Sequence, residues 1–383
     1  MNETRIMNPR NARSSRRARA RNFWERSQKP AHDPAAAQAF GEKLAGVLNS
    51  AGLALMISLG HRSGLFDAMA GQGALGAEQL AKRAKLNERY VREWLGAMVT
   101  GGIVRYLPHE RTYELPAEHA ACLTRAAAPN NMAATMQWIP VLGSVEDGVL
   151  EAFRFGGGVR YEAYARFHEV MAEESAQTTV AGLHEHILPL VDGLKARLDS
   201  GIEVLDIGCG AGRALNALAA AYPNSRFTGY DFSEEGIARA RATAADAKLE
   251  NVRFEVRDAA RLGECERYDL ITAFDAVHDQ ADPVGVLDGI AAALKPSGVF
   301  LMQDIHSSSH LHKNQAHPLG PFLYTISCMH CMTVSLAQGG AGLGTCWGVE
   351  LAQEMLAGAG FARVSVHTLP HDALNAYFVA RKA

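Results

Sequence analysis

Short apolar runs and amphipathic segments alternate along the C-terminal half of the chain, from residue 202 onward. The runs expected to form strands are 202–208, 225–231, 252–258, 268–277 and 298–304. The segments that repeat apolar residues at helical spacing are 213–222, 234–247, 283–294 and 348–360. This alternation predicts an α/β fold, in which a mostly parallel sheet carries helices on both faces. The runs 363–369 and 375–382 predict a final antiparallel pair.

The pattern before residue 126 is mostly helical. Residues 39–69 repeat apolar positions at helical spacing with breaks expected at the glycines. Two more helices are expected in 76–86 and 87–104, the second with Asn87 as its N-cap. Residues 102–115 predict a hairpin. Three helices and a hairpin indicate a winged-helix arrangement.

Four regions follow from these patterns. They are a basic tail (1–33), the winged-helix domain (34–125), a helical connector (126–200) and the α/β domain (201–383). The connector contains a flexible boundary near the three glycines at 156–158.

Charge is distributed unevenly along the chain. The net charge is −3, yet residues 1–30 carry +7 and residues 31–383 carry −10. We expect the tail to be disordered, although it could be a nucleic-acid arm or a transit peptide. The acidic body would repel a nucleic-acid backbone.

The sequence suggests neither a membrane span nor secretion. No apolar run reaches the roughly 18 to 20 residues that a spanning helix needs, and the Arg-rich start leads into no apolar signal-peptide core. We therefore expect a cytoplasmic protein with no membrane partner.

Six cysteines at irregular spacings favour reduced thiols over a disulfide framework. Cys328 and Cys331, with Cys346 beyond, form the one metal-like cluster in the sequence. A structural zinc site usually needs two such pairs, so we expect no metal, and a zinc site through these thiols remains a minor alternative.

A winged helix often binds DNA, but the helix in the recognition position has no net positive charge. Arg89 and Arg92 stand beside Glu88 and Glu93. We interpret the domain as a dimerisation or substrate-covering module, and its long apolar helices suggest an intertwined homodimer.

The segment "VLDIGCGAG", residues 204–212, follows a predicted strand and opens a predicted helix. Glycines there let a ligand lie directly on the backbone at a helix N-terminus. Asp206 at the strand end would repel a pyrophosphate and attract an ammonium group. Asp231 and Asp258 end the next two strands, where they could bind a ribose and an adenine. A ligand with these groups and no phosphate is S-adenosylmethionine.

Residues 202–383 resemble the class I S-adenosylmethionine-dependent methyltransferases. In that family, positions matching Gly208, Gly210, Asp231 and Asp258 bind the cofactor. The resemblance implies a cofactor site made of Asp206, Gly208, Gly210, Gly212, Asp231, Phe232, Asp258, Ala259, Phe274 and Asp275.

The winged-helix domain ahead of this fold resembles that of small-molecule O-methyltransferases, in which such a domain dimerises and closes over the substrate. Residues 89–104, 274–283 and 318–344 look like a bacterial group of winged-helix methyltransferases whose substrates are mostly unassigned. O-methyltransferases carry His-Asp-x-x-Asp after the fourth strand, with the His as general base. His278, Asp279 and Asp282 match this motif, but the Trp common after His-Asp is missing.

We therefore expect a methyltransferase for a small molecule, with His278 as base and Asp279 orienting its ring. Alternatively, His278 caps the helix that starts near Pro283, with Asp279 as its N-terminal acid. Nitrogen, carbon and sulfur acceptors stay open beside a hydroxyl. A second class of function is a transcriptional regulator that senses S-adenosylmethionine or a metabolite.

The long segment 306–348 is expected to be the substrate lid. Its candidate substrate contacts are Tyr324, His330 and Trp347.

Overall fold

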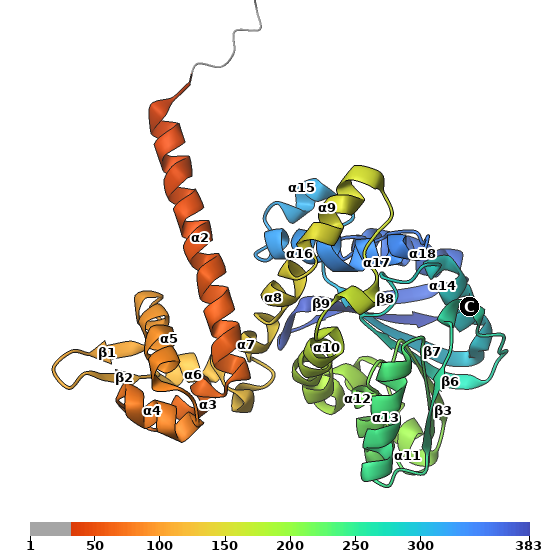
Figure 1. The fold of residues 1–383 in the computed structure, drawn as a ribbon. Coiled ribbons are helices and arrows are strands. Elements are labelled where there is room, and N and C mark those ends of the chain that lie inside the picture. The colour runs from red at the N-terminus through yellow and green to blue at the C-terminus, as the bar shows by residue number, and fades with distance from the viewer. Residues whose placement is uncertain (1–31) are drawn as a thin grey trace, which may run out of the picture. The chain divides into compact units, whose positions relative to one another are not determined.

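The computed structural model describes residues 32–383 and separates into two compact units that meet at Gly52 and Leu53. The first unit holds most of the helix α2 (Pro34–Arg62), and the second contains the remaining elements (Figure 1). The tail predicted for residues 1–33 lies almost wholly outside the described residues.

Helix α2 runs without interruption through Gly41, Gly46, Gly52 and Gly60, so the breaks predicted at these four glycines are wrong. The break predicted at Gly64 is present, because Gly64 has a φ of 73° between α2 and the next helix. A glycine costs a helix only about 1 kcal/mol relative to Ala, which neighbouring contacts can offset. At Gly60 a Cβ would lie 2.6 Å from the Trp94 ring, so the glycine permits close packing with helix α5 (Glu88–Thr100).

The length of α2 also revises the expectation about membranes. Within residues 32–383, α2 is the one helix long and apolar enough to cross a bilayer, judged by length and composition alone. Core helices of water-soluble proteins pass the same test.

The winged-helix region matches its predicted elements. After α2 come α3 (Leu65–Met69), α4 (Ala77–Ala84), α5, and the antiparallel strands β1 (Arg105–Leu107) and β2 (Thr112–Glu114). Asn87 caps α5 by accepting a hydrogen bond from the Arg89 amide at 3.0 Å. Phe66, Trp94 and Leu95 are buried in its core.

The connector consists of many short helical pieces. They are α6 (Ala117–Leu123), η1 (Arg125–Ala127), α7 (Met132–Thr135), α8 (Trp138–Gly143), α9 (Glu146–Phe155), η2 (Tyr161–Ala163), α10 (Phe167–Ser175), η3 (Ala176–Val180), η4 (Leu183–Ile187), η5 (Leu188–Leu190) and α11 (Leu194–Ser200). After residue 166 the helical connector continues as α10 followed by two π-helical turns, η3 and η4. π-helical turns of this kind frequently lie at functional sites.

The C-terminal domain has the predicted seven-stranded sheet. Its spatial order is β5 (Val252–Val256), β4 (Arg226–Asp231), β3 (Glu203–Ile207), β6 (Tyr268–Phe274), β7 (Leu294–Ile305), β9 (Asp372–Arg381) and β8 (Arg363–Leu369). The first five strands are parallel, and β9 pairs antiparallel with both β7 and β8.

Helices cover both faces of this sheet (Figure 1). One face packs on α11, α12 (Arg213–Ala221) and α13 (Glu234–Asp246). The other packs on α14 (Pro283–Ala293) and α18 (Gly348–Gly358). Successive residues of β3 alternate between the two cores, as Val204 joins one and Leu205 the other.

Between β7 and α18 lie the small helices of the predicted lid. They are α15 (Leu311–Asn314), α16 (Gly320–Ile326), the π-turn η7 (Ser327–Cys331) and α17 (Met332–Ala337).

Candidate functional site

A cavity of about 190 Å³ opens beyond the carboxyl ends of β3, β4, β6 and β7. Its walls come from the connector, the glycine turn after β3, the loop after β6 and the segment 322–345. In an open α/β sheet this edge is where ligands bind.

The glycine turn after β3 forms one wall. Gly208, Gly210 and Gly212 all have positive φ angles, 68°, 51° and 66°, which other residues rarely adopt. A Cβ on Gly208 would collide with Ala276. The turn is held to β4 by the Gly208 amide, which donates to the Tyr230 carbonyl at 2.9 Å. Residues 208–211 of this turn line the cavity, so a ligand can approach their backbone.

Two strand-end carboxyl groups lie beside the turn. Asp206 is buried and accepts a hydrogen bond from the Thr272 hydroxyl at 2.6 Å. Burial raises the pKa of Asp206 to about 7. Asp231 accepts from the amides of Gly210 and Ser233, both at 2.8 Å, and burial also raises its pKa.

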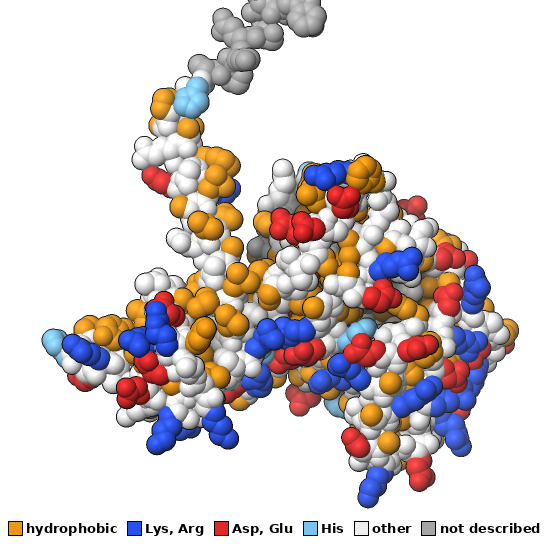
Figure 2. Space-filling view, viewed as in Figure 1, with side chains coloured by type: hydrophobic (Ala, Val, Ile, Leu, Met, Phe, Trp, Pro, Cys, Tyr) orange, Lys and Arg blue, Asp and Glu red, His pale blue; other side chains and the backbone are white. Residues whose placement is uncertain are grey.

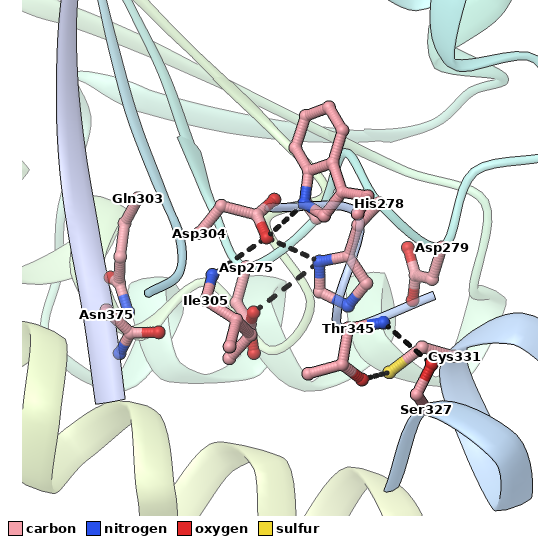
Figure 3. Close-up of polar contacts among 12 residues, drawn as sticks. Asp275, His278, Asp279, Gln303, Asp304, Ile305, Ser327, Cys331, Thr345 and Asn375 are labelled. Atoms are coloured by element: carbon pink, nitrogen blue, oxygen red, sulfur yellow. Dashed lines mark hydrogen bonds and ion pairs between the residues drawn. The ribbon is translucent and has the colours of Figure 1, made fainter. Parts of the chain in front are cut away.

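His278 lines the cavity, and its ring is held by Asp304 near the end of β7 (Figure 3). The imidazole Nδ1 is 2.9 Å from Asp304 Oδ1 and 3.8 Å from Asp275 Oδ1. The same Asp304 oxygen accepts the Trp347 indole N–H at 2.9 Å. With Nδ1 engaged by Asp304, Nε2 is the other ring nitrogen, and the Cys331 thiol also interacts with the His278 side chain.

Burial acts against charge on His278, but the Asp304 carboxylate outweighs it and raises the pKa of the imidazole well above its usual value. Burial raises the pKa of Asp275 to about 7, partly offset by His278. Asp275 also has a positive φ of 55°, a backbone conformation that is costly for a non-glycine residue.

The orienting carboxylate differs from the predicted one. Asp279 does not reach the His278 ring, and instead accepts a hydrogen bond from the Tyr161 hydroxyl (Figure 3). The alternative helix-capping role fails as well, because Asp282 caps α14 by accepting from the Gly285 amide at 2.9 Å.

The comparisons with known proteins agree with this architecture. Residues 51–125 match the family described as the Rv2258c-like winged HTH domain, and residues 198–360 match a methyltransferase domain. The chain carries a winged-helix domain followed by a class I methyltransferase domain.

Solved structures share this fold over nearly the whole chain. The human N-acetylserotonin methyltransferase, in complex with SAM, is 17% identical, with 93% of this chain and 99% of that chain covered and a TM-score of 0.66. The mitomycin 7-O-methyltransferase MmcR is 18% identical, with 91% and 100% covered and a TM-score of 0.64.

Among curated proteins, the ubiquinone biosynthesis O-methyltransferase of Coxiella burnetii is 33% identical over 107 residues. That match covers 28% of this chain and 44% of the relative. The chain thus spans less than half the length of the curated relatives it matches.

Most of the predicted cofactor residues of the methyltransferase domain line the cavity. They are Asp206, Gly208, Gly210, Asp231, Phe232, Phe274 and Asp275. Three do not line it. A Cβ on Gly212 would lie 2.6 Å from the Phe254 ring, so this glycine serves packing beneath the turn. Asp258 is exposed and caps η6 (Ala259–Arg261) by accepting from the Ala260 amide, and Ala259 is buried in the core.

None of the three predicted substrate residues lines the cavity. Trp347 is buried in the core with its indole on Asp304. His330 is buried and stacks on Phe167 with ring centroids 4.5 Å apart, and burial lowers its pKa to about 3. The Tyr324 hydroxyl accepts from Asn314 Nδ2 at 3.0 Å. These residues lie in the lid as predicted, but their position in the sequence did not show whether their side chains point into the cavity.

The three cysteines of the lid do not assemble a metal site in the part of the chain that the structure describes. Cys331 Sγ accepts from the Thr345 hydroxyl at 3.3 Å. The group that could hold a cation is Asp275, His278 and Asp304, whose ligand atoms lie within 4.8 Å of one another.

Five residues of the site were not predicted from the sequence, namely Asp304, which is buried against His278 behind the cavity wall, and four residues that line the cavity. Asp304 ends the fifth parallel strand, so the strand-end argument used for Asp206 and Asp231 could have found it. Tyr161, Phe167 and Glu174 come from the connector, and Thr179 lies in the π-turn η3, where its hydroxyl donates to Gln303 Oε1 at 2.9 Å. No motif in the connector signals these four.

Proposed function

We propose that this protein transfers a methyl group from S-adenosyl-L-methionine to a hydroxyl oxygen of a small molecule, with His278 as general base. The observation that carries the proposal is the pairing of His278 with Asp304 in a cavity that also exposes the glycine turn. The curated O-methyltransferase relatives support an oxygen acceptor.

The chemistry of the cavity suits this cofactor. When bound, S-adenosyl-L-methionine supplies an electrophilic methyl group on a sulfonium sulfur. Asp206 would hold the ammonium group of the cofactor and Asp231 its ribose. The glycine turn would let the cofactor lie close to the protein backbone. Arg213 is the one Lys or Arg among the lining residues of the described chain, and it is exposed, so nothing there favours a phosphate.

His278 would take the proton of the acceptor hydroxyl at Nε2. Asp304 on Nδ1 fixes the orientation of the ring and stabilises the imidazolium that forms. The cavity walls exclude water and align the acceptor, which is the main contribution a protein makes to such an in-line displacement.

The test is His278→Ala. We expect turnover to fall by about 10² to 10⁴ while cofactor affinity, measured by calorimetry, is kept. His310→Ala, an exposed histidine in the lid, is the matched control. Unchanged turnover in His278→Ala would remove the base role and reopen nitrogen, carbon or sulfur acceptors.

The regulator alternative is less favoured. Arg89 and Arg92 on α5 form ion pairs with Glu93 and Glu88 on the same helix, so they offer little charge to phosphates. A gel shift with genomic DNA fragments at physiological salt tests this, since specific retardation would favour the regulator.

We also propose that the protein is a homodimer through its winged-helix region and acts in the cytoplasm. The exposed apolar side chains of α2 support the dimer.

A further inference from the structure

An aromatic wall lies along one side of the cavity, between two carboxyl groups. Trp138, Phe167 and Tyr161 all line the cavity, and their rings are in contact. The ring centroids of Trp138 and Phe167 are 5.7 Å apart, and those of Phe167 and Tyr161 are 5.2 Å apart. One face of the Phe167 ring is stacked on His330 with centroids 4.5 Å apart. The faces of aromatic rings carry negative electrostatic potential.

A carboxyl group holds each end of the wall. The Trp138 indole N–H donates to Glu174 Oε2, and the Tyr161 hydroxyl donates to Asp279 Oδ2. Both acids also line the cavity. Among the described residues, Oδ1 of Asp279 has no hydrogen-bond partner, so it is free to accept from a ligand.

Positive charge is scarce beside these acids. Five acidic side chains line the cavity, namely Glu174, Asp206, Asp231, Asp275 and Asp279. Arg213 is exposed, and the other cationic candidates among the described lining residues are His168 and His278. Asp206 and Asp231 stand at the glycine turn, where the cofactor is proposed to bind. Glu174 comes from α10, where its Oε1 also accepts from the Thr135 hydroxyl at 3.2 Å, and Asp279 comes from the loop after β6, so neither acid belongs to the glycine turn.

We propose that the acceptor is a ring compound bearing a protonated amine, bound against the Trp138–Phe167–Tyr161 wall with its cationic nitrogen at Glu174 or Asp279. This rests on the proposed function in taking the cavity as the acceptor site. Aromatic faces attract ammonium groups, and a buried carboxylate strengthens that attraction. A carboxylate or phosphate on the acceptor would meet like charge instead.

Supporting this assignment, burial raises the pKa values of both Glu174 and Asp279, so burial disfavours their negative charges. A cationic ligand would compensate those charges, whereas an anionic ligand would add to the cost.

The experiment measures binding rather than turnover. Wild-type protein saturated with S-adenosylhomocysteine is titrated at pH 8 with three probes of similar size, which are tyramine, 4-ethylphenol and 3-(4-hydroxyphenyl)propanoate. We expect tyramine to bind at least about tenfold more tightly than the acid, with the neutral phenol between them.

Two variants locate the preference. Glu174→Gln and Asp279→Asn preserve the acceptor oxygens for Trp138 and Tyr161 while removing charge. We expect one or both to weaken tyramine binding by about three- to tenfold and to leave 4-ethylphenol within about twofold. Glu169→Gln, on the exposed side of the same helix α10, is the control, and thermal melts verify folding of each variant.

The proposal is overturned if the acid or the neutral phenol binds as tightly as tyramine, if tyramine shows no binding up to about 10 mM, or if both variants weaken all probes equally. The S-adenosylhomocysteine titration that precedes each series separates the two claims. Its failure would count against the proposed function, whereas its success with a failed amine preference would count against this inference alone.

Discussion

Asp304 uses a single carboxyl oxygen to fix the geometry around His278. Oδ1 receives the imidazole Nδ1 and the Trp347 indole at 2.9 Å, and the Ile305 amide at 2.8 Å. Oδ2 is buried and has no hydrogen-bond partner among the described residues. Three neighbours on one oxygen leave Asp304 little freedom to rotate, so we regard it as the positioning residue for His278.

Asp304→Asn tests that role. The neutral amide keeps an acceptor oxygen but cannot stabilise an imidazolium, so we expect kcat to fall by about 10- to 100-fold. Because the carboxylate raises the pKa of His278, its loss should lower that pKa and move the rising limb of the pH–rate profile to lower pH. An unchanged pH profile with reduced kcat would indicate a merely structural role. Asp282→Asn, at the cap of α14, is the control.

Asp206 makes a prediction about stability. Its pKa is about 7 in the folded protein, against about 3.9 in an unfolded chain. A raised carboxyl pKa means that the folded state holds its proton more tightly. The protonated Asp206 therefore contributes fully to the free energy of unfolding below about pH 4, and this contribution is lost as the pH rises toward 7.

We expect the free energy of unfolding of the ligand-free protein to fall by roughly 2–4 kcal/mol more between pH 4 and 8 in wild type than in Asp206→Asn. Chemical denaturation at several pH values measures the difference. Glu173, whose pKa is lowered to about 2 by its hydrogen bond with His61, acts below this window. If the free energy of unfolding depended on pH in the same way in both proteins, Asp206 would not be the group that takes up the proton.

At the scale of elements, the connector and the lid form a joint cover for the cavity. The Val159 amide donates to the Thr333 hydroxyl at 3.0 Å, and the Tyr164 hydroxyl donates to the Met329 carbonyl at 2.6 Å. Gly158 lies so close to α17 that a Cβ would collide with the Thr333 carbonyl. Gly158, the last residue of the flexible boundary predicted at 156–158, therefore packs against the lid.

Gly158→Ala should disturb this cover. We expect a loss of about 1–3 kcal/mol in stability, because backbone atoms on both sides must shift. Tyr161 follows in the same loop, so KM for the acceptor should rise more than the dissociation constant of the cofactor. Gly143→Ala, where a Cβ would meet nothing within 4 Å, is the control. If both variants changed the stability and the KM equally, the packing of Gly158 against the lid would not be important.

The elements show which parts of the fold the sequence could predict. The strand β8 and the helix α14 agree with their apolar patterns almost to the residue, because periodicity reports local burial. The π-turns did not follow from any pattern, since one inserted residue shifts the helical register without a local signature. His278 lies in the loop after β6 and Asp304 lies near the end of the neighbouring strand β7, so the two could have been paired from the sheet order. Tyr161 and Asp279 are 118 residues apart, and only the tertiary fold brings them together.

At the scale of the whole molecule, α2 presents an apolar stripe. Phe40, Leu44, Val47 and Leu48 follow helical spacing and are between 52% and 74% exposed. Figure 2 shows hydrophobic side chains along this helix. A large exposed apolar patch indicates a protein or membrane partner. A second copy would bring an identical stripe, which a two-fold axis can pair with the first.

The double variant Leu44→Glu, Leu48→Glu distinguishes these partners. We expect the wild-type chain to elute as a dimer at micromolar concentration by light scattering. The variant should have the mass of one chain, because paired glutamates would repel across the two-fold axis. Glu42→Lys, on the opposite side of α2 where Glu42 accepts from Gln38 Nε2 at 3.1 Å, should remain dimeric. A monomeric wild type that sediments with phospholipid vesicles would contradict the dimer and assign the stripe to a bilayer.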